Sequence, residues 1–441
     1  MSASYASLRL GPVRVDGVTA LLRPPRFDDF DAWRRLRLRD RDELEPFWFS
    51  SPLTWDQRHS RAQWVRECLA AASEAAAGRR IGTVLEIDGQ FAGQIELVGI
   101  DPRTRAAELS VWVDAEVGRR GVTGLAGAML LDFAFAEASL ERVTAPVAVT
   151  NVDARRAVRK YWAREAVLTR YFDVGGRRID HELWALTRDR LPEGGLVAEL
   201  LAAHPGATRT SVPAPAPVRG RPIPRTTVLC VRARQLLGRV RHLADPLRGS
   251  RPISVYDDKQ HVTVRSWRPR DFLHDTEHPT AGTALPTTSS VAAARRRRTP
   301  RAWWCGALAS RAGLRSSHGL VFTVEHEGRR VGTCRLFDQD MFDRNVRAAV
   351  AISPATDPAI AATALRMLIA HATEQLGIWR VALTVPTSDR TGAAVAMSAG
   401  LHHEGTLHRF RGSDGTFTDH DLWAFSTAPD HVTADTGGAL P

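Results

Sequence analysis

The chain has 441 residues, of which 44% are hydrophobic and 25% are charged. At about 100–200 residues per domain, this length predicts two or three globular domains that can each bury a core. The formal net charge of +11 resides on arginine, because Lys160 and Lys259 are the only lysines. Its densest run, residues 295–298, is interpreted as a solvated loop, with a dedicated RNA contact as the alternative. Sequence-specific binding of nucleic acid is not expected, and contact with polyanions such as the ribosome would rest on general electrostatics.

Hydropathy and cysteine usage argue against two further classes. The longest apolar stretch, residues 122–140, carries Asp132 and Glu137, so we expect a buried amphipathic helix and no membrane span. The N-terminus lacks the charged start and apolar run of a secretory signal. The cysteines have no metal-ligand spacing and are expected to be free thiols of a cytoplasmic protein without a metal. They are Cys68, Cys230, Cys305 and Cys334.

In chain order, the first half predicts strands alternating with helices. A strand over 19–23 runs into a helix over 27–40, and Asp88-Gly89 is a strong signal for a hairpin turn. A strand over 107–114 then leads through a glycine-bearing loop into a long helix. The remaining expected elements are that helix (124–139), a strand (142–150), a helix (153 to about 164) and two strands (168–174 and 179–186). This order predicts an α/β fold with a mixed, mostly antiparallel sheet and flanking helices.

The middle of the chain predicts a linker and one helix. Residues 204–224 are rich in proline, alanine and arginine, a composition that favours extended chain. Residues 228–247 are apolar and rich in arginine, with Leu236, Leu237, Val240 and Leu243 at helical spacing. We interpret them as an amphipathic helix that bridges the halves and packs on a domain. The alternative is a helix on a membrane surface.

The second half repeats the first. Asp180-His181-Glu182-Leu183-Trp184-Ala185 recurs as Asp419-His420-Asp421-Leu422-Trp423-Ala424, at an offset of 419 − 180 = 239. The same offset joins Glu86 to Glu325 and Glu165 to Glu404. A strand over 262–265 and a helix from Asp271 open the second copy. We therefore predict two tandem domains at 1–190 and 256–428, a linker at 191–255 and a tail at 429–441.

The segment from Gly118 to Gly124 carries the sharpest functional signal. It ends a strand and opens a helix, so that free backbone N–H groups and the positive end of the helix dipole would converge on one spot. Arg119 and Arg120 add charge for phosphate oxygens. This pattern is typical of a pyrophosphate site. It also fits a tight turn with solvated arginines.

Several motifs together resemble one family over about residues 8–190. The first domain resembles the GNAT superfamily, and within it the ribosomal-protein-alanine N-acetyltransferases. The motifs are Leu22-Arg23-Pro24, residues 44–48, the loop Gly118-Arg119-Arg120-Gly121-Val122-Thr123, Asn151-Val152-Asp153-Ala154, residues 161–166, Leu168-Thr169-Arg170-Tyr171 and Asp180-His181. The resemblance implies that acetyl-CoA is a substrate and that its acetyl group passes directly to a primary amine.

The resemblance also implies roles for individual residues. Trp112, Val113, Gly118, Arg119, Arg120, Gly121, Val122, Thr123, Gly124 and Asn151 are the expected acetyl-CoA contacts. Glu108 is the candidate base, and the alternative is a solvent-facing residue of an alternating strand. Asn151 binds the cofactor, caps the next helix, or does both. Asp180 and His181 are expected to be structural, since they recur in the second copy.

Two departures from the family pattern bear on activity. Gly118, Thr123 and Ala154 replace the usual residues, and the lost serine at Ala154 leaves no obvious group to reprotonate the CoA thiolate. In the second copy, residues 353–360 contain no glycine but do contain Pro354, Asp357 and Pro358. A proline removes an N–H and an aspartate repels phosphate, so this copy is expected to fold without binding CoA well.

Three functions follow as hypotheses. The first is acetylation of a protein N-terminus, such as that of a ribosomal protein, by the first domain. The second is acetylation of a small amine such as an aminoglycoside or a polyamine, against which the scarcity of acidic clusters in the sequence argues. The third is a non-catalytic pair of domains that senses acetyl-CoA or docks on a partner such as the ribosome. Acceptor choice would depend on loops such as residues 43–54.

Overall fold

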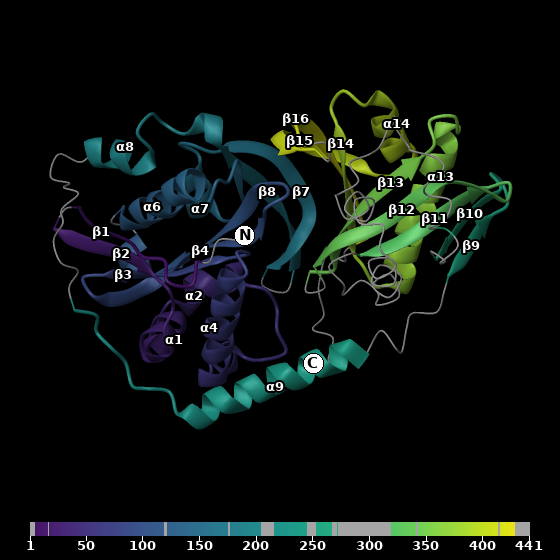
Figure 1. Cartoon of the computed structure of the whole chain (residues 1–441). Helices are drawn as coiled ribbons and strands as arrows, with labels where there is room; N and C mark the ends of the chain where they lie inside the picture. Colours follow the sequence, from purple (N-terminus) through teal and green to yellow (C-terminus); the bar gives the residue numbers. More distant parts are fainter. Residues whose placement is uncertain are drawn as a thin grey trace.

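The structure is a computed structural model and describes residues 5–15, 17–118, 121–174, 177–203, 216–244, 253–266, 271, 319–340, 343–412 and 415–427. Figure 1 shows two α/β units, the first coloured purple to teal and the second green to yellow, with helix α9 running along one side. No described helix is long and apolar enough to cross a membrane.

In the first unit the described strands lie in the order β1-β2-β3-β4-β5-β6-β8-β7. All neighbours are antiparallel except β5 and β6, which are parallel. Their bounds are β1 Leu10–Val15, β2 Val18–Arg23, β3 Ile81–Ile87, β4 Gln90–Asp101, β5 Ala106–Val113, β6 Arg142–Ala148, β7 Ala163–Val174 and β8 Arg177–Thr187. The mixed, mostly antiparallel sheet is as predicted, and Asp88 and Gly89 form the β3–β4 turn at positive φ.

Helices cover both faces of this sheet. They are η1 Phe27–Asp29, α1 Phe30–Arg39, α2 Arg41–Leu44, η2 Glu45–Phe47, α3 Trp55–Arg58, α4 Arg61–Ala76, α5 Ala115–Gly118, α6 Val122–Ala136, α7 Val152–Val158, η3 Arg188–Arg190 and α8 Leu196–Ala202. Helix α6 is apolar on nearly all sides and lies in the larger core with Leu130, Ile95 and Leu186. Helices α1 and α4 form a smaller aromatic cluster on β3–β5 with Trp33, Trp64 and Trp112.

One predicted boundary is wrong. The helix expected to reach about residue 164 ends at Val158, and strand β7 begins at Ala163. Trp162 closes the intervening turn by donating its N–H to the Val158 carbonyl, and its side chain is buried in the main core. Burial of this indole therefore ends the helix earlier than the local pattern indicates.

The linker packs on the first unit where it is described. The Val218 N–H donates to Gly89 O at 2.8 Å, and the Gly220 N–H donates to Asp28 O at 3.1 Å. Helix α9 (Arg225–Ala244) then packs against α4 and buries Val231. It therefore packs on a domain, as favoured from the sequence, although Leu236 and Leu237 remain exposed.

The second unit repeats the strand order of the first. Its strands are β9 Ser254–Asp257, β10 Val262–Ser266, β11 Leu320–His326, β12 Arg329–Asp340, β13 Asn345–Ile352, β14 Arg380–Pro386, β15 His402–Arg411 and β16 Phe417–Ser426. Its described helices are α13 Pro358–Ala370, η6 His371–Gln375 and α14 Arg390–Ser398. The helix predicted to start at Asp271 lies outside the described residues except for Asp271 itself.

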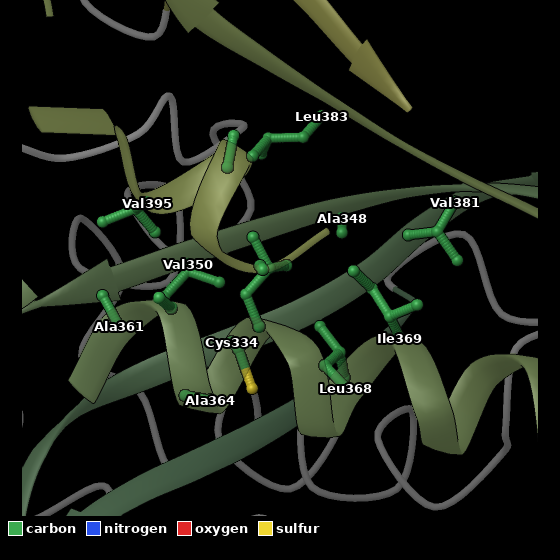
Figure 2. Close-up of a cluster of buried hydrophobic side chains, with 14 of the residues drawn as sticks. Cys334, Ala348, Val350, Ala361, Ala364, Leu368, Ile369, Val381, Leu383 and Val395 are labelled. Carbon is green, nitrogen blue, oxygen red and sulfur yellow. The ribbon is translucent and has the colours of Figure 1, made fainter. Parts of the chain in front are cut away.

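A separate core holds the second unit together. Figure 2 shows Ala361, Ala364, Leu368 and Ile369 of α13 packed on Cys334 and the neighbouring strands. As in the first unit, one parallel strand pair stands among antiparallel ones, here β13 with β14. The exact division of the chain into domains stays a prediction.

Strands β7 and β15 join the two units into one continuous sheet, with Ala166 opposite Gly405. A Cβ atom on Gly405, whose φ is +156°, would overlap the carbonyl oxygen of Glu165 and the Cα of Ala166. Glycine at this position therefore allows the two backbones to approach. An apolar cluster with members from both units, including Leu168 and Leu407, packs beside this contact.

Two buried ion pairs reinforce this seam with near two-fold symmetry. Arg142 pairs with Glu165, and Glu165 Oε1 accepts the His408 N–H of the second unit at 3.0 Å. Arg380 pairs with Glu404, and Glu404 Oε1 accepts the Thr169 N–H of the first unit at 2.9 Å. Of the repeated glutamates in the sequence, Glu165 and Glu404 therefore each contact the other copy.

The repeated Asp-His pairs are structural, as expected. Asp180 Oδ1 accepts the Arg170 N–H at 2.9 Å, and Asp419 Oδ1 accepts the Arg409 N–H at 3.0 Å. Both arginines have positive φ and lie at irregularities of the β7–β8 and β15–β16 pairing. Burial lowers the pKa of His181 to about 4, so its imidazole is neutral near pH 7.

Candidate functional site

Strands β5 and β6 separate after three residue pairs. Their parallel pairing covers residues 106–108 and 142–144, although β5 continues to Val113 and β6 to Ala148. The Asp114 N–H donates to Ala92 O of β4. Because successive residues of a strand direct their backbone groups to opposite sides, the N–H of Val113 faces the side from which β6 has diverged. The two strands therefore leave a splayed edge, with Val113 at its end.

The N-terminus of α6 lies just beyond this edge. Gly121 is its N-cap with φ +73°, a left-handed conformation that favours glycine, and no described side chain caps the helix there. A Cβ atom added at Gly121, Gly124 or Gly127 would meet no heavy atom within 4 Å. Thr123 Oγ1 is buried without a hydrogen-bond partner among the described residues. Open glycine backbone, uncapped N–H groups and an orphaned hydroxyl fit a phosphate-bearing ligand.

The remaining predicted cofactor contacts are placed unevenly. Gly118 ends the short helix α5, and Arg119 and Arg120 lie outside the described residues. Val122 is buried in the core at the first position of α6. Trp112 points to the opposite face of the sheet, where its indole N–H donates to Gln94 Oε1 at 2.8 Å. It can therefore offer acetyl-CoA its backbone only.

Asn151 caps helix α7. Its side-chain oxygen accepts the Ala154 N–H at 3.0 Å. From the sequence, Asn151 could cap this helix, bind the cofactor, or do both. In this structure its side chain caps the helix. The carboxylate of Asp389 caps α14 of the second unit in the same way, through the Gly392 N–H at 2.8 Å.

Glu108 is half-buried and lies at the junction with the second unit. Burial raises its pKa to about 7, and the negative charges of Asp340 and Asp343 act in the same direction. Burial also raises the pKa of Asp343 to about 7. Glu108 is half-buried, so its role as the base and the alternative of a solvent-facing residue both stay predictions. The negative charges of Asp340 and Asp343 come from the second unit, and the scarcity of acidic clusters in the sequence did not indicate them.

The loop at residues 43–54, which includes the motif at 44–48, packs on Arg37 of α1, a residue that the sequence did not single out. Trp48 stacks on the guanidinium of Arg37 at 4.0 Å, and the other face of this guanidinium lies 3.8 Å from the Trp112 ring centroid. Arg37 is only 3% exposed, and its Nε and Nη1 have no hydrogen-bond partner among the described residues. Burial lowers its pKa to about 9. The base of this loop therefore holds two buried guanidinium N–H groups that the described part of the chain does not pair.

Two residues of β7 lie near the loop at residues 43–54 and Glu108. Asp173 holds the loop through Ser50, accepting its N–H at 2.9 Å and its hydroxyl at 3.0 Å. Burial raises the pKa of Tyr171, and the charge of Glu108 acts in the same direction. The Leu-x-Arg-Tyr motif that contains Tyr171 was the available signal, but it did not indicate which elements this side chain would meet.

A family model described as the acetyltransferase (GNAT) domain matches residues 20–161. RimJ from Mycobacterium smegmatis, solved with a CoA disulfide, is 32% identical, and the match covers 47% of this chain and 100% of that one with a TM-score of 0.44. The N-terminal part of this chain belongs to the GNAT acetyltransferases. Its GNAT domain is an acetyltransferase domain that uses acetyl-CoA.

Other solved structures resemble the GNAT domain at lower identity. The ribosomal-protein-S5-alanine acetyltransferase of Vibrio fischeri is 17% identical, with 39% of this chain and 96% of that one covered and a TM-score of 0.36. The spermidine N-acetyltransferase of Vibrio cholerae, solved with CoA and spermine, is 20% identical, with 39% and 96% covered and a TM-score of 0.34. No curated protein sequence matches the chain.

Proposed function

We propose that the GNAT domain acetylates the N-terminal amine of a protein, such as a ribosomal protein, with the acceptor approaching Glu108 past the loop at residues 43–54. The observation that carries this proposal is the splay of β5 from β6 directly beside the uncapped N-terminus of α6. It supports a thioester at the splayed edge and phosphates at Gly121–Gly124. Glu108 lies on the same strand as Val113.

The chemistry assigns one task to each group. An N-terminal amine has a pKa of about 7.7–8.0, so near neutral pH it must lose a proton before it attacks. Glu108 accepts that proton directly or through water. The amine nitrogen then bonds to the thioester carbon, and the carbon–sulfur bond breaks. The Val113 N–H stabilises the oxyanion. As the carbon–sulfur bond breaks, the nitrogen loses its second proton, and the departing CoA thiolate takes up one proton through water.

We further propose that the second unit does not bind acetyl-CoA. Asp357 caps helix α13 by accepting the Ala359 N–H at 2.8 Å, and Pro358 supplies no N–H to the first turn. The place that phosphates would need is therefore occupied by a carboxylate of the chain itself. The corresponding expectation is a stoichiometry of one acetyl-CoA per chain.

One observation favours a polyamine acceptor as the second candidate. Glu108, Asp340 and Asp343 act on one another electrostatically across the junction, and a cationic amine would be attracted there. A panel of N-terminal peptides and spermidine, assayed by CoA thiol release with the full chain, separates the two acceptors. Binding of acetyl-CoA with no transfer to any amine would contradict both and favour a sensor.

The acetyl-CoA site is tested with Gly121→Ala. A left-handed residue other than glycine costs about 1–2 kcal/mol, although the space for the new Cβ is open. We expect acetyl-CoA to bind roughly tenfold more weakly by isothermal titration calorimetry. Gly328→Ala is the matched control, because Gly328 has φ +75° and equally open space in the β11–β12 turn of the second unit. Equal weakening in both variants would contradict the placement of the site.

A further inference from the structure

We propose that the second unit is a positioning element of the acceptor site, because Asp343 and Asn345 anchor the β7–β8 hairpin that holds the loop at residues 43–54. This inference rests on the proposed function, in which that loop guides the acceptor. It gives the second unit a task that does not need a cofactor of its own.

The first link is a chain of hydrogen bonds through Asp173. The carboxylate of Asp173 accepts both the N–H and the hydroxyl of Ser50, in the loop. The backbone N–H of the same aspartate donates to Asp343 Oδ1 at 3.2 Å. One residue of β7 therefore contacts the loop with its side chain and the second unit with its backbone.

The second link runs through Arg178 on β8, whose side chain is 0% exposed. Its Nη1 donates to Asp343 O at 2.8 Å, and its Nη2 donates to Asn345 Oδ1 at 3.0 Å and to Tyr171 O. The Asn345 amide donates back to Tyr171 O at 3.1 Å. Both strands of the hairpin are thus fastened to residues 343–345 by a buried, charge-assisted network.

The equivalent hairpin of the second unit, β15–β16, does not carry the same residues at the corresponding positions. In the first hairpin Asp173 lies opposite Arg178, and the corresponding rung of the second hairpin is Arg411 opposite Phe417. At this rung the second unit contacts the first through Arg411, whose Nη1 donates to the Arg103 carbonyl at 2.7 Å. The β15–β16 hairpin is held in the other direction by different residues, since Arg409 forms ion pairs with Glu141 and Asp189 of the first unit. The acidic contact at the Asp173–Arg178 rung is therefore specific to the β7–β8 hairpin, which holds the loop of the GNAT domain.

The anchored loop leads back to the reaction centre. Trp48, two residues before Ser50, stacks on Arg37, which stacks in turn on Trp112 of β5. Loosening Ser50 would therefore disturb Trp48 and Arg37, which we place beside the acceptor. The α6 N-terminus takes no part in this network, so acetyl-CoA affinity should be independent of it.

The test is Asp343→Ala in the full chain. We expect the acceptor KM to rise about tenfold or more, since the Asp173 N–H loses its acceptor and Arg178 loses the carboxylate that lies 3.5 Å from its Nη1. The Arg178 hydrogen bond to the backbone carbonyl of residue 343 remains. The acetyl-CoA Kd should stay within about twofold, and hydrogen exchange at the Ser50 amide should accelerate. Glu374→Ala removes an exposed carboxylate of the second unit and should change none of these.

Ser50→Ala checks that Ser50 and Asp343, the two ends of the hydrogen-bond chain through Asp173, act together. If they do, the double variant Ser50→Ala/Asp343→Ala should raise the acceptor KM little beyond either single variant. Additive effects would overturn the proposal, as would a Ser50 amide that exchanges at the wild-type rate in Asp343→Ala. If Asp343→Ala does not fold, Asn345→Ala must show faster exchange at Ser50, and an unchanged rate overturns the proposal.

These readouts separate this inference from the proposed function. A wild-type chain that binds acetyl-CoA but acetylates no amine refutes the proposed function, and the exchange measurement still decides the anchoring. Normal transfer by the wild type with an unchanged acceptor KM in Asp343→Ala refutes the anchoring alone.

Discussion

Glu108→Gln is expected to lower kcat/KM by about 10²–10⁴-fold, the range that a positioned general base contributes. Glutamine keeps the size of the side chain but cannot accept the proton that the acceptor ammonium must lose before the amine attacks. The measurement is CoA thiol release at saturating acetyl-CoA over a range of acceptor concentrations. Glu116→Gln is the matched control, because Glu116 is an exposed acid on the adjoining helix α5 and its loss should leave kcat/KM unchanged.

The pH profile sharpens this test. Burial and the charges of Asp340 and Asp343 raise the pKa of Glu108 to about 7, so the base is protonated and inactive below that pH. The wild-type rate should therefore rise with pH up to about 7, over a broadened step, because Asp343 titrates nearby. Glu108→Gln should lose this step and keep the one due to the acceptor amine. A variant with wild-type rate and profile would remove Glu108 from the mechanism.

Glu165→Ala is expected to destabilise the chain by about 3–5 kcal/mol, because it leaves a buried guanidinium without its partner. Arg142 and Glu165 are 4% and 1% exposed, and Glu165 also accepts the His408 N–H across the seam. Chemical denaturation followed by tryptophan fluorescence measures the change. Asp153→Ala, which removes a solvent-exposed ion pair with Arg156, should cost less than about 1 kcal/mol.

The near symmetry of the seam supplies an internal check. Glu404 pairs with Arg380 and accepts the Thr169 N–H in the equivalent arrangement, so Glu404→Ala should cost about as much as Glu165→Ala. If one of these variants lowers the free energy of unfolding strongly and the other does not, the two ion pairs are not equivalent. That result would also argue against the seam as a single cooperative contact.

Much of the fold could be predicted because its signals are local. Asp88-Gly89 identified the β3–β4 turn, since few dipeptides tolerate two consecutive residues at positive φ. The glycines between β5 and the next helix indicated a tight turn, and the structure places Gly121 there as the left-handed N-cap of α6. Local pattern failed at the end of α7, where burial of Trp162 decided the boundary.

The candidate site was only half predictable. Its acetyl-CoA side is one continuous segment, so residues 108–124 carried the signal. Its acceptor side joins Ser50, Asp173 and Asp343, and the last two are 170 residues apart in the chain. No spacing rule connects such residues, because the register of separate strands brings them together. The acidic surroundings of Glu108 were missed for the same reason.

The repeated motifs and the turn residues were enough to predict two similar α/β halves and a glycine-bearing turn before α6, because such signals lie in short stretches of sequence. How the two halves contact each other depended on the folded chain. Gly405 lets β15 approach β7, and the two buried ion pairs then hold the copies as one sheet. That contact places Asp340 and Asp343 beside Glu108, where low exposure to water makes their charges effective.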